Sequence, residues 1–79
     1  MTNENNKPIH KINLGSGITA SIWENSTDNG VLHAVEVERR YLQGDEWKTS
    51  KTYVGSQILL VSKAYELAFD YIQSIKSKN

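Results

Sequence analysis

Apolar and polar residues alternate along most of the first two thirds of the chain, which is the pattern of half-buried β-strands. Four segments show this alternation: residues 9–14, 18–25, 31–42 and 47–54. Short stretches containing glycine separate them, and glycine accepts the positive φ angles of tight hairpins. The pattern therefore predicts four antiparallel strands joined by hairpins.

The third predicted strand places Val35 and Val37 on the same side as Arg39 and Tyr41. Because successive side chains of a strand point to opposite faces, a flat strand would turn Arg39 and Tyr41 toward the core. Either Arg39 lies beyond the part of the sheet that a helix covers, or a bulge shifts the strand. The alternation of side chains along the strand does not distinguish these two explanations.

The apolar spacing changes to steps of three and four residues over 57–76, which predicts one helix. The order β-β-β-β-α predicts an α+β domain with a four-stranded antiparallel sheet followed by one long C-terminal helix. The apolar stripe of this helix is wider than a small sheet needs, so we expect part of it to contact a symmetry mate. The expected contacts are Val61, Tyr65, Ala68, Phe69 and Ile72.

The chain has 79 residues and no cysteine. Residues 1–8 are polar and are expected to form a disordered tail, which leaves 9–76 as a single domain. A domain of this size buries only about 60% of its unfolded surface. Without disulfides, small domains often gain further burial by oligomerising, so we expect a homodimer.

No segment has the composition of a signal peptide or the roughly 20 apolar residues of a membrane span. We therefore expect a cytoplasmic protein without a membrane partner, and association with the nucleoid is compatible with this location.

The chain also lacks recognisable catalytic or metal-binding patterns. Gly15-Ser16-Gly17 joins two strands, whereas a nucleophile elbow or phosphate loop precedes a helix. His10 and His33 have no neighbours at metal-ligand spacing. Glu36 and Glu38 share one strand face and are interpreted as solvated. We expect no enzymatic activity, no catalytic residue, no metal and no cofactor.

Cations and aromatic residues gather in residues 39–53, although the whole chain is neutral with nine of each charge sign. Single-stranded nucleic acid is bound by flat rings on which bases stack and by cations that follow the phosphates. Alternatively, the rings fill a thin core and the cations are solvated edge residues. Composition favours neither interpretation. The residues concerned are Arg39, Arg40, Tyr41, Trp47, Lys48, Lys51 and Tyr53, with Trp23 from the second strand.

The stretches "ITASIWEN" and "VEVERRYLQGDEWKTS", followed by a single apolar helix, resemble the positive cofactor four family of transcriptional coactivators. The likeness is strongest to its small bacterial and phage relatives, and it covers residues 9–75. It implies a homodimer that binds single-stranded DNA across its sheets without sequence preference, in transcription, replication or recombination. On matching positions it implies DNA contacts at Arg39, Arg40, Tyr41, Trp47, Lys48, Lys51 and Tyr53, and more weakly at Lys11 and Trp23.

A second hypothesis belongs to another class. The same dimer would be a protein-interaction or regulatory module, since Trp, Tyr and Arg are favoured at interface hot spots. A positive groove beside exposed rings would favour nucleic acid, and a face dominated by Glu36 and Glu38 would favour protein. The sequence does not distinguish DNA from RNA as the ligand.

Overall fold

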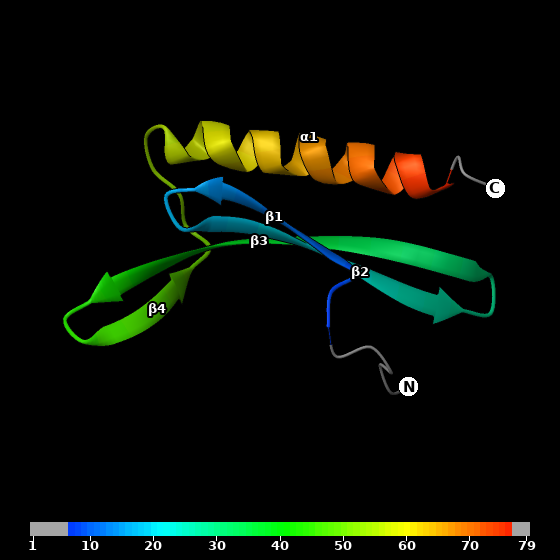
Figure 1. Ribbon diagram of the computed structural model, residues 1–79, viewed down its shortest axis with the longest axis horizontal. Helices are drawn as coiled ribbons and strands as arrows, with labels where there is room; N and C mark the ends of the chain where they lie inside the picture. The colour runs from blue at the N-terminus through cyan, green and yellow to red at the C-terminus, as the bar shows by residue number, and fades with distance from the viewer. Residues whose placement is uncertain (1–6, 77–79) are drawn as a thin grey trace.

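The computed structural model describes residues 7–76, so most of the predicted tail, residues 1–6, lies outside the described part. Four strands form one antiparallel sheet in the order β1-β2-β3-β4, and the helix α1 lies across one of its faces (Figure 1). This confirms the predicted α+β class and element order. The elements are β1 His10–Gly15, β2 Ile18–Thr27, β3 Gly30–Gln43, β4 Glu46–Ser50 and α1 Gln57–Lys76.

The core lies between α1 and the middle of the sheet. Alternation in β2 turns Ile18, Ala20 and Ile22 toward the helix, and all three are fully buried. Ala64 and Ala68 lie one turn apart on α1 and are also fully buried. Their small side chains let the helix backbone approach the sheet closely.

The length of β3 gives the sheet two arms. Its first half pairs with β2 from Thr27↔Gly30 to Ile18↔Arg39, and its second half pairs with β4 from Arg39↔Ser50 to Gln43↔Glu46. Both hairpin ends extend past the core and bend away from α1 (Figure 1). The sheet therefore has one face covered by the helix and an opposite face, the open face, that is concave.

The fourth strand is shorter than the sequence predicted. The prediction placed it at residues 47–54, but β4 ends at Ser50. The Ser50 hydroxyl accepts a 3.0 Å hydrogen bond from the Thr52 amide and donates a 3.3 Å bond to the Thr52 carbonyl. Such local bonds between side chain and backbone compete with ladder pairing. Residues 51–54 consequently leave the sheet and lead into α1.

One flank of α1 is apolar and exposed to solvent. Its members Ile58, Tyr65 and Phe69 are 57%, 49% and 59% exposed, and we call them the apolar flank. The predicted contact residue Ala68 does not belong to this flank, because it is buried against the sheet within one chain. Val61 packs at the edge of the core and Ile72 is half-buried. Within residues 7–76, no helix is both long enough and apolar enough to cross a membrane.

Candidate nucleic-acid interface

Strand pairing divides the predicted cluster between the two faces of the sheet. Residues directly opposite each other in an antiparallel pair share a face. The pairs Leu42↔Trp47 and Arg40↔Thr49 lie on the open face, whereas Tyr41↔Lys48 lies on the helix side. The pairing of β3 with β2 and β4 is continuous, so no bulge reverses this order. The cluster is therefore two sets of residues with different surroundings.

The open face carries an aromatic residue toward each arm. Trp47 is 62% exposed, and Trp23 is half-buried opposite Ala34. The eight-residue step along β3 from Leu42 to Ala34 separates the two tryptophan positions by about 26 Å. The strand residues of the open face are Lys11, Asn13, Thr19, Ser21, Trp23, Ala34, Glu36, Glu38, Arg40, Leu42, Trp47 and Thr49.

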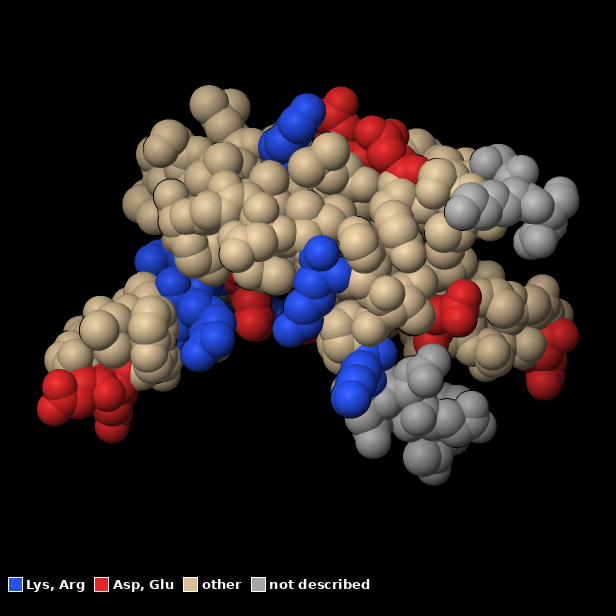
Figure 2. All heavy atoms as spheres, viewed as in Figure 1, with Lys and Arg blue, Asp and Glu red and all other residues tan. Residues whose placement is uncertain are grey.

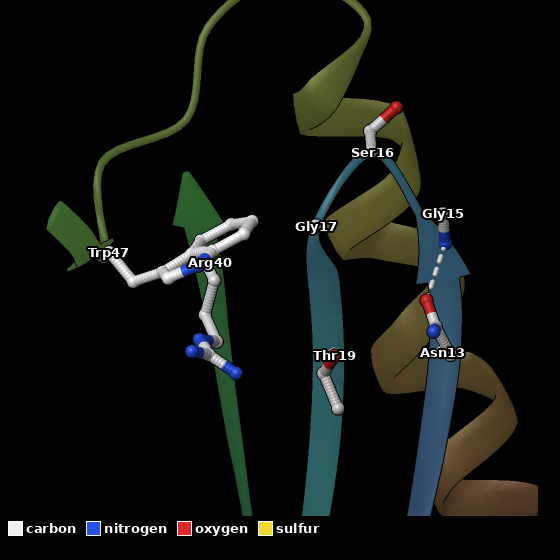
Figure 3. Close-up of a pocket in the computed structure, with 7 residues that line it drawn as sticks. All are labelled: Asn13, Gly15, Ser16, Gly17, Thr19, Arg40 and Trp47. Atoms are coloured by element: carbon white, nitrogen blue, oxygen red, sulfur yellow. Dashed lines mark hydrogen bonds between the residues drawn. The ribbon is translucent and has the colours of Figure 1, made fainter. Parts of the chain in front are cut away.

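Arg40 and Trp47 form the most clearly defined ring and cation pair on this face. The guanidinium carbon of Arg40 lies 5.3 Å from the centre of the Trp47 ring, within cation-π range. The indole extends from β4 across β3 toward the β1–β2 turn (Figure 3). A flat apolar surface and a permanent positive charge are thereby held side by side, in contact with solvent.

An open groove of about 590 Å³ lies between this pair and the turn at residues 15–17 (Figure 3). Two hydrogen bonds fix its shape. The Asn13 Oδ1 atom accepts a 2.9 Å bond from the Gly15 amide, and the Gly17 carbonyl accepts a 2.9 Å bond from the Arg40 amide. The groove is lined by Asn13, Gly15, Ser16, Gly17, Thr19, Arg40 and Trp47.

Two carboxylates partly neutralise the positive charge of the open face. Lys51 Nζ lies 2.8 Å from Glu36 Oε2, and this hydrogen bond raises the pKa of the Lys51 ammonium group. The open face thus carries two carboxylates, Glu36 and Glu38, and three cations, Lys11, Arg40 and Lys51. Its net charge is one positive charge. Figure 2 shows basic side chains beneath the sheet between the arms, and acidic ones at both arm tips.

Arg39, Tyr41 and Lys48 lie on the other side of the β3–β4 arm. The guanidinium carbon of Arg39 lies 4.8 Å from the centre of the Tyr41 ring, and Lys48 Nζ lies 3.7 Å from Glu46 Oε1. Arg39 Nε is buried and makes no hydrogen bond within the described chain. These residues cannot contact a strand lying along the open face, although they form a second ring and cation pair around the edge of the arm.

Tyr53 belongs to the core side. Its hydroxyl donates a 2.6 Å hydrogen bond to the Val37 carbonyl, and its ring packs against the core cluster. Burial raises the pKa of this hydroxyl. The Tyr53 side chain is half-buried in this position, whereas that of Trp47 is exposed. The two interpretations of the sequence thus apply to different residues: Tyr53 packs against the core, whereas Trp47 is open to solvent.

The sequence reasoning missed the polar side of the groove. Asn13 and Thr19 pair directly across β1 and β2 on the open face. The Gly-Ser-Gly turn could have indicated this register, because the hairpin loop sets which residues lie opposite each other. These residues carry neither a charge nor an aromatic ring, so composition gave no signal for them.

The described residues hold no group of three or more His, Asp or Glu side chains that could bind a metal. His33 and Glu24 form an isolated pair, with Nε2 3.3 Å from Oε2, on the helix side of the other arm.

Comparisons with protein-family models, with curated proteins and with solved structures find no match to this chain. The fold and the side chains of the open face are therefore the basis for the function proposed below.

Proposed function

We propose that this chain is a homodimeric single-stranded DNA-binding module without enzymatic activity, which acts in transcription, replication or recombination. The observation that supports this most strongly is the Trp47 ring, 62% exposed beside the Arg40 guanidinium on a concave sheet face. The resemblance to the positive cofactor four family supports the same class.

The open face offers the two kinds of contact that an unpaired strand needs. A base that stacks on an aromatic side chain contributes about 1–3 kcal/mol, and this contact tolerates every base because each has a π-face. Cations on the same face neutralise phosphates and release counterions, so binding should weaken as salt rises. With Trp47, Arg40 and Lys11 as its principal contacts, the proposed surface is smaller than the cluster predicted from sequence.

A second copy of the chain is the proposed occupant of the apolar flank. Six apolar residues form the buried core within residues 7–76, and a small domain of this kind gains stability by further burial in an oligomer. Isologous pairing of two flanks would cover Ile58, Tyr65 and Phe69 at once. It would also leave both open faces free, because the flank lies on α1 and not on the open side of the sheet.

One observation favours the alternative, a protein-interaction or regulatory dimer. Glu36 neutralises Lys51, and Glu38 adds a second carboxylate near the centre of the open face. A partner surface with basic side chains would complement these carboxylates, whereas a phosphate backbone would be repelled. Removal of these acidic groups should strengthen binding to DNA under the first hypothesis. Under the second it should weaken binding to a basic protein partner.

The deciding experiment is a titration of a fluorescently labelled thymidine oligonucleotide at two salt concentrations, with the wild-type chain and Trp47→Ala. We expect saturable binding that weakens with salt, and an increase in Kd of about tenfold for Trp47→Ala. The free energy of unfolding should change by less than about 0.5 kcal/mol, as for other surface substitutions.

Leu59→Ala is the matched control, since it truncates an exposed apolar side chain on the helix. It should bind as the wild type does. Absence of saturable binding at low salt, or unfolding of Trp47→Ala, would remove the proposed function.

A further inference from the structure

The groove at the β1–β2 turn is large enough to admit one nucleobase. Its volume of about 590 Å³ lies within the range of roughly 300–1,000 Å³ typical of small-molecule sites. The Trp47 indole forms one side and supplies a stacking surface. Gly17 lines the opposite side at the β1–β2 turn, where the absence of a Cβ lets its backbone lie against the Arg40 carbonyl.

The polar groups of the groove are mainly hydrogen-bond donors. Asn13 Oδ1 already accepts the Gly15 amide, and the Asn13 Nδ2 group carries two N–H donors. The Arg40 guanidinium has donors and no acceptor. The Ser16 and Thr19 hydroxyls can act in either direction. A ligand that presents adjacent acceptors would therefore satisfy this groove better than one that presents donors.

Among the nucleobases, guanine presents that arrangement most fully. Its O6 and N7 atoms are neighbouring acceptors, and an arginine can bind both at once. Adenine carries the N6 amino donor beside N7, and cytosine carries an N4 amino donor, so each would place a donor against the donors of the groove. In unpaired strands, bases are read in this way when an aromatic side chain holds them by stacking.

We infer that this groove receives a single base of the bound strand and prefers guanine, with the base stacked on Trp47 and its O6/N7 edge toward Arg40. This inference rests on the proposed function. It adds a local base preference to a surface whose remaining contacts are indifferent to sequence.

The test compares thymidine oligonucleotides that carry one central dG, dA, dC or 7-deaza-dG. We expect the dG strand to bind about tenfold more tightly than the dA strand. The 7-deaza base replaces N7 by a carbon, and we expect it to lose much of this advantage. Because the change is made in the DNA, this comparison does not depend on the folding of a variant.

Arg40→Lys keeps the charge and loses the planar fork, so the ratio of dG to dA affinity should fall toward one. Glu66→Gln on the helix serves as the control and should keep the wild-type ratio.

Equal affinities for dG and dA in the wild type would overturn the inference while leaving the proposed function in place. A guanine preference that survives in Arg40→Lys would overturn the assignment to this groove. Absence of binding to every strand, including plain thymidine, would overturn both proposals.

Discussion

Gly17 and Arg40 meet backbone to backbone at the base of the groove. The Arg40 amide donates a 2.9 Å hydrogen bond to the Gly17 carbonyl, and a Cβ atom at Gly17 would overlap the Arg40 carbonyl oxygen. Gly17 also has φ of +78°, a conformation that other residues rarely adopt. The β1–β2 turn is therefore fixed against β3 at the position where Arg40 enters the open face.

Gly17→Ala should destabilise the fold by about 2–3 kcal/mol, because the backbone would be strained and the turn would move away from β3. Gly15→Ala is the matched control: Gly15 has φ of +87° but open space where the Cβ would lie. It should cost only about 1 kcal/mol. Urea unfolding of both variants measures the difference, and equal losses would show that the contact with Arg40 does not matter.

The periodicity of the sequence was sufficient for the architecture. The change from alternation to helical spacing located the helix at residues 57–76, and the structure has Gln57–Lys76. Ile18, Ala20 and Ile22 were expected to share one side of the second strand, and all three are fully buried in the core. These features depend on local spacing, which the sequence contains directly.

The position of the candidate site could not be predicted from the spacing of residues in the sequence alone. Alternation left open whether Arg39 and Tyr41 turn toward the core or a bulge intervenes, and the continuous pairing of β3 places both on the helix side. The fourth strand was predicted too long because Ser50 forms local bonds with Thr52 that a period-two pattern does not reveal. Tyr53 consequently packs against the core from the segment that follows β4.

Glu36→Gln tests how the carboxylates affect binding to DNA. The substitution removes the partner that lies 2.8 Å from Lys51 Nζ and frees this ammonium group for a phosphate. Affinity for a thymidine oligonucleotide at low salt should increase. The slope of log K against log salt should become steeper by about 0.7, the value for one further phosphate contact on a single strand.

Glu66→Gln provides the comparison for this experiment. Glu66 Oε1 lies 3.6 Å from Lys63 Nζ on α1, so the substitution also frees a lysine, but on the helix. It should leave the salt slope unchanged. Weaker DNA binding by Glu36→Gln would contradict the view that this carboxylate opposes the phosphates.

Tyr53→Phe should lower stability and change its dependence on pH. Loss of the hydrogen bond to Val37 should cost about 1 kcal/mol at neutral pH. Burial raises the folded-state pKa of this hydroxyl above its ordinary 10.0. The neutral form is therefore favoured in the folded state, and its contribution is fully present below the unfolded pKa and lost as pH rises through the folded pKa.

Urea unfolding of the wild type and Tyr53→Phe near neutral pH and above pH 10.0 measures this effect. The advantage of the wild type should shrink in the alkaline range. Tyr41→Phe is the control, because Tyr41 lies on the arm and outside the core cluster. It should follow the wild-type pH profile. An unchanged difference between wild type and Tyr53→Phe across this range would contradict the assigned burial of the hydroxyl.

Phe69→Lys tests the proposed dimer. Phe69 is the most exposed member of the apolar flank at 59%, and a lysine at this position would place an unpaired charge in an apolar contact, which is costly. Light scattering after size-exclusion chromatography should give a dimeric mass for the wild type and a monomeric mass for the variant. Leu59→Lys makes the same chemical change at a side chain that is 73% exposed but lies outside the flank, so it should remain dimeric. A monomeric wild type, or dissociation by Leu59→Lys alone, would show that the flank does not pair two copies of the chain.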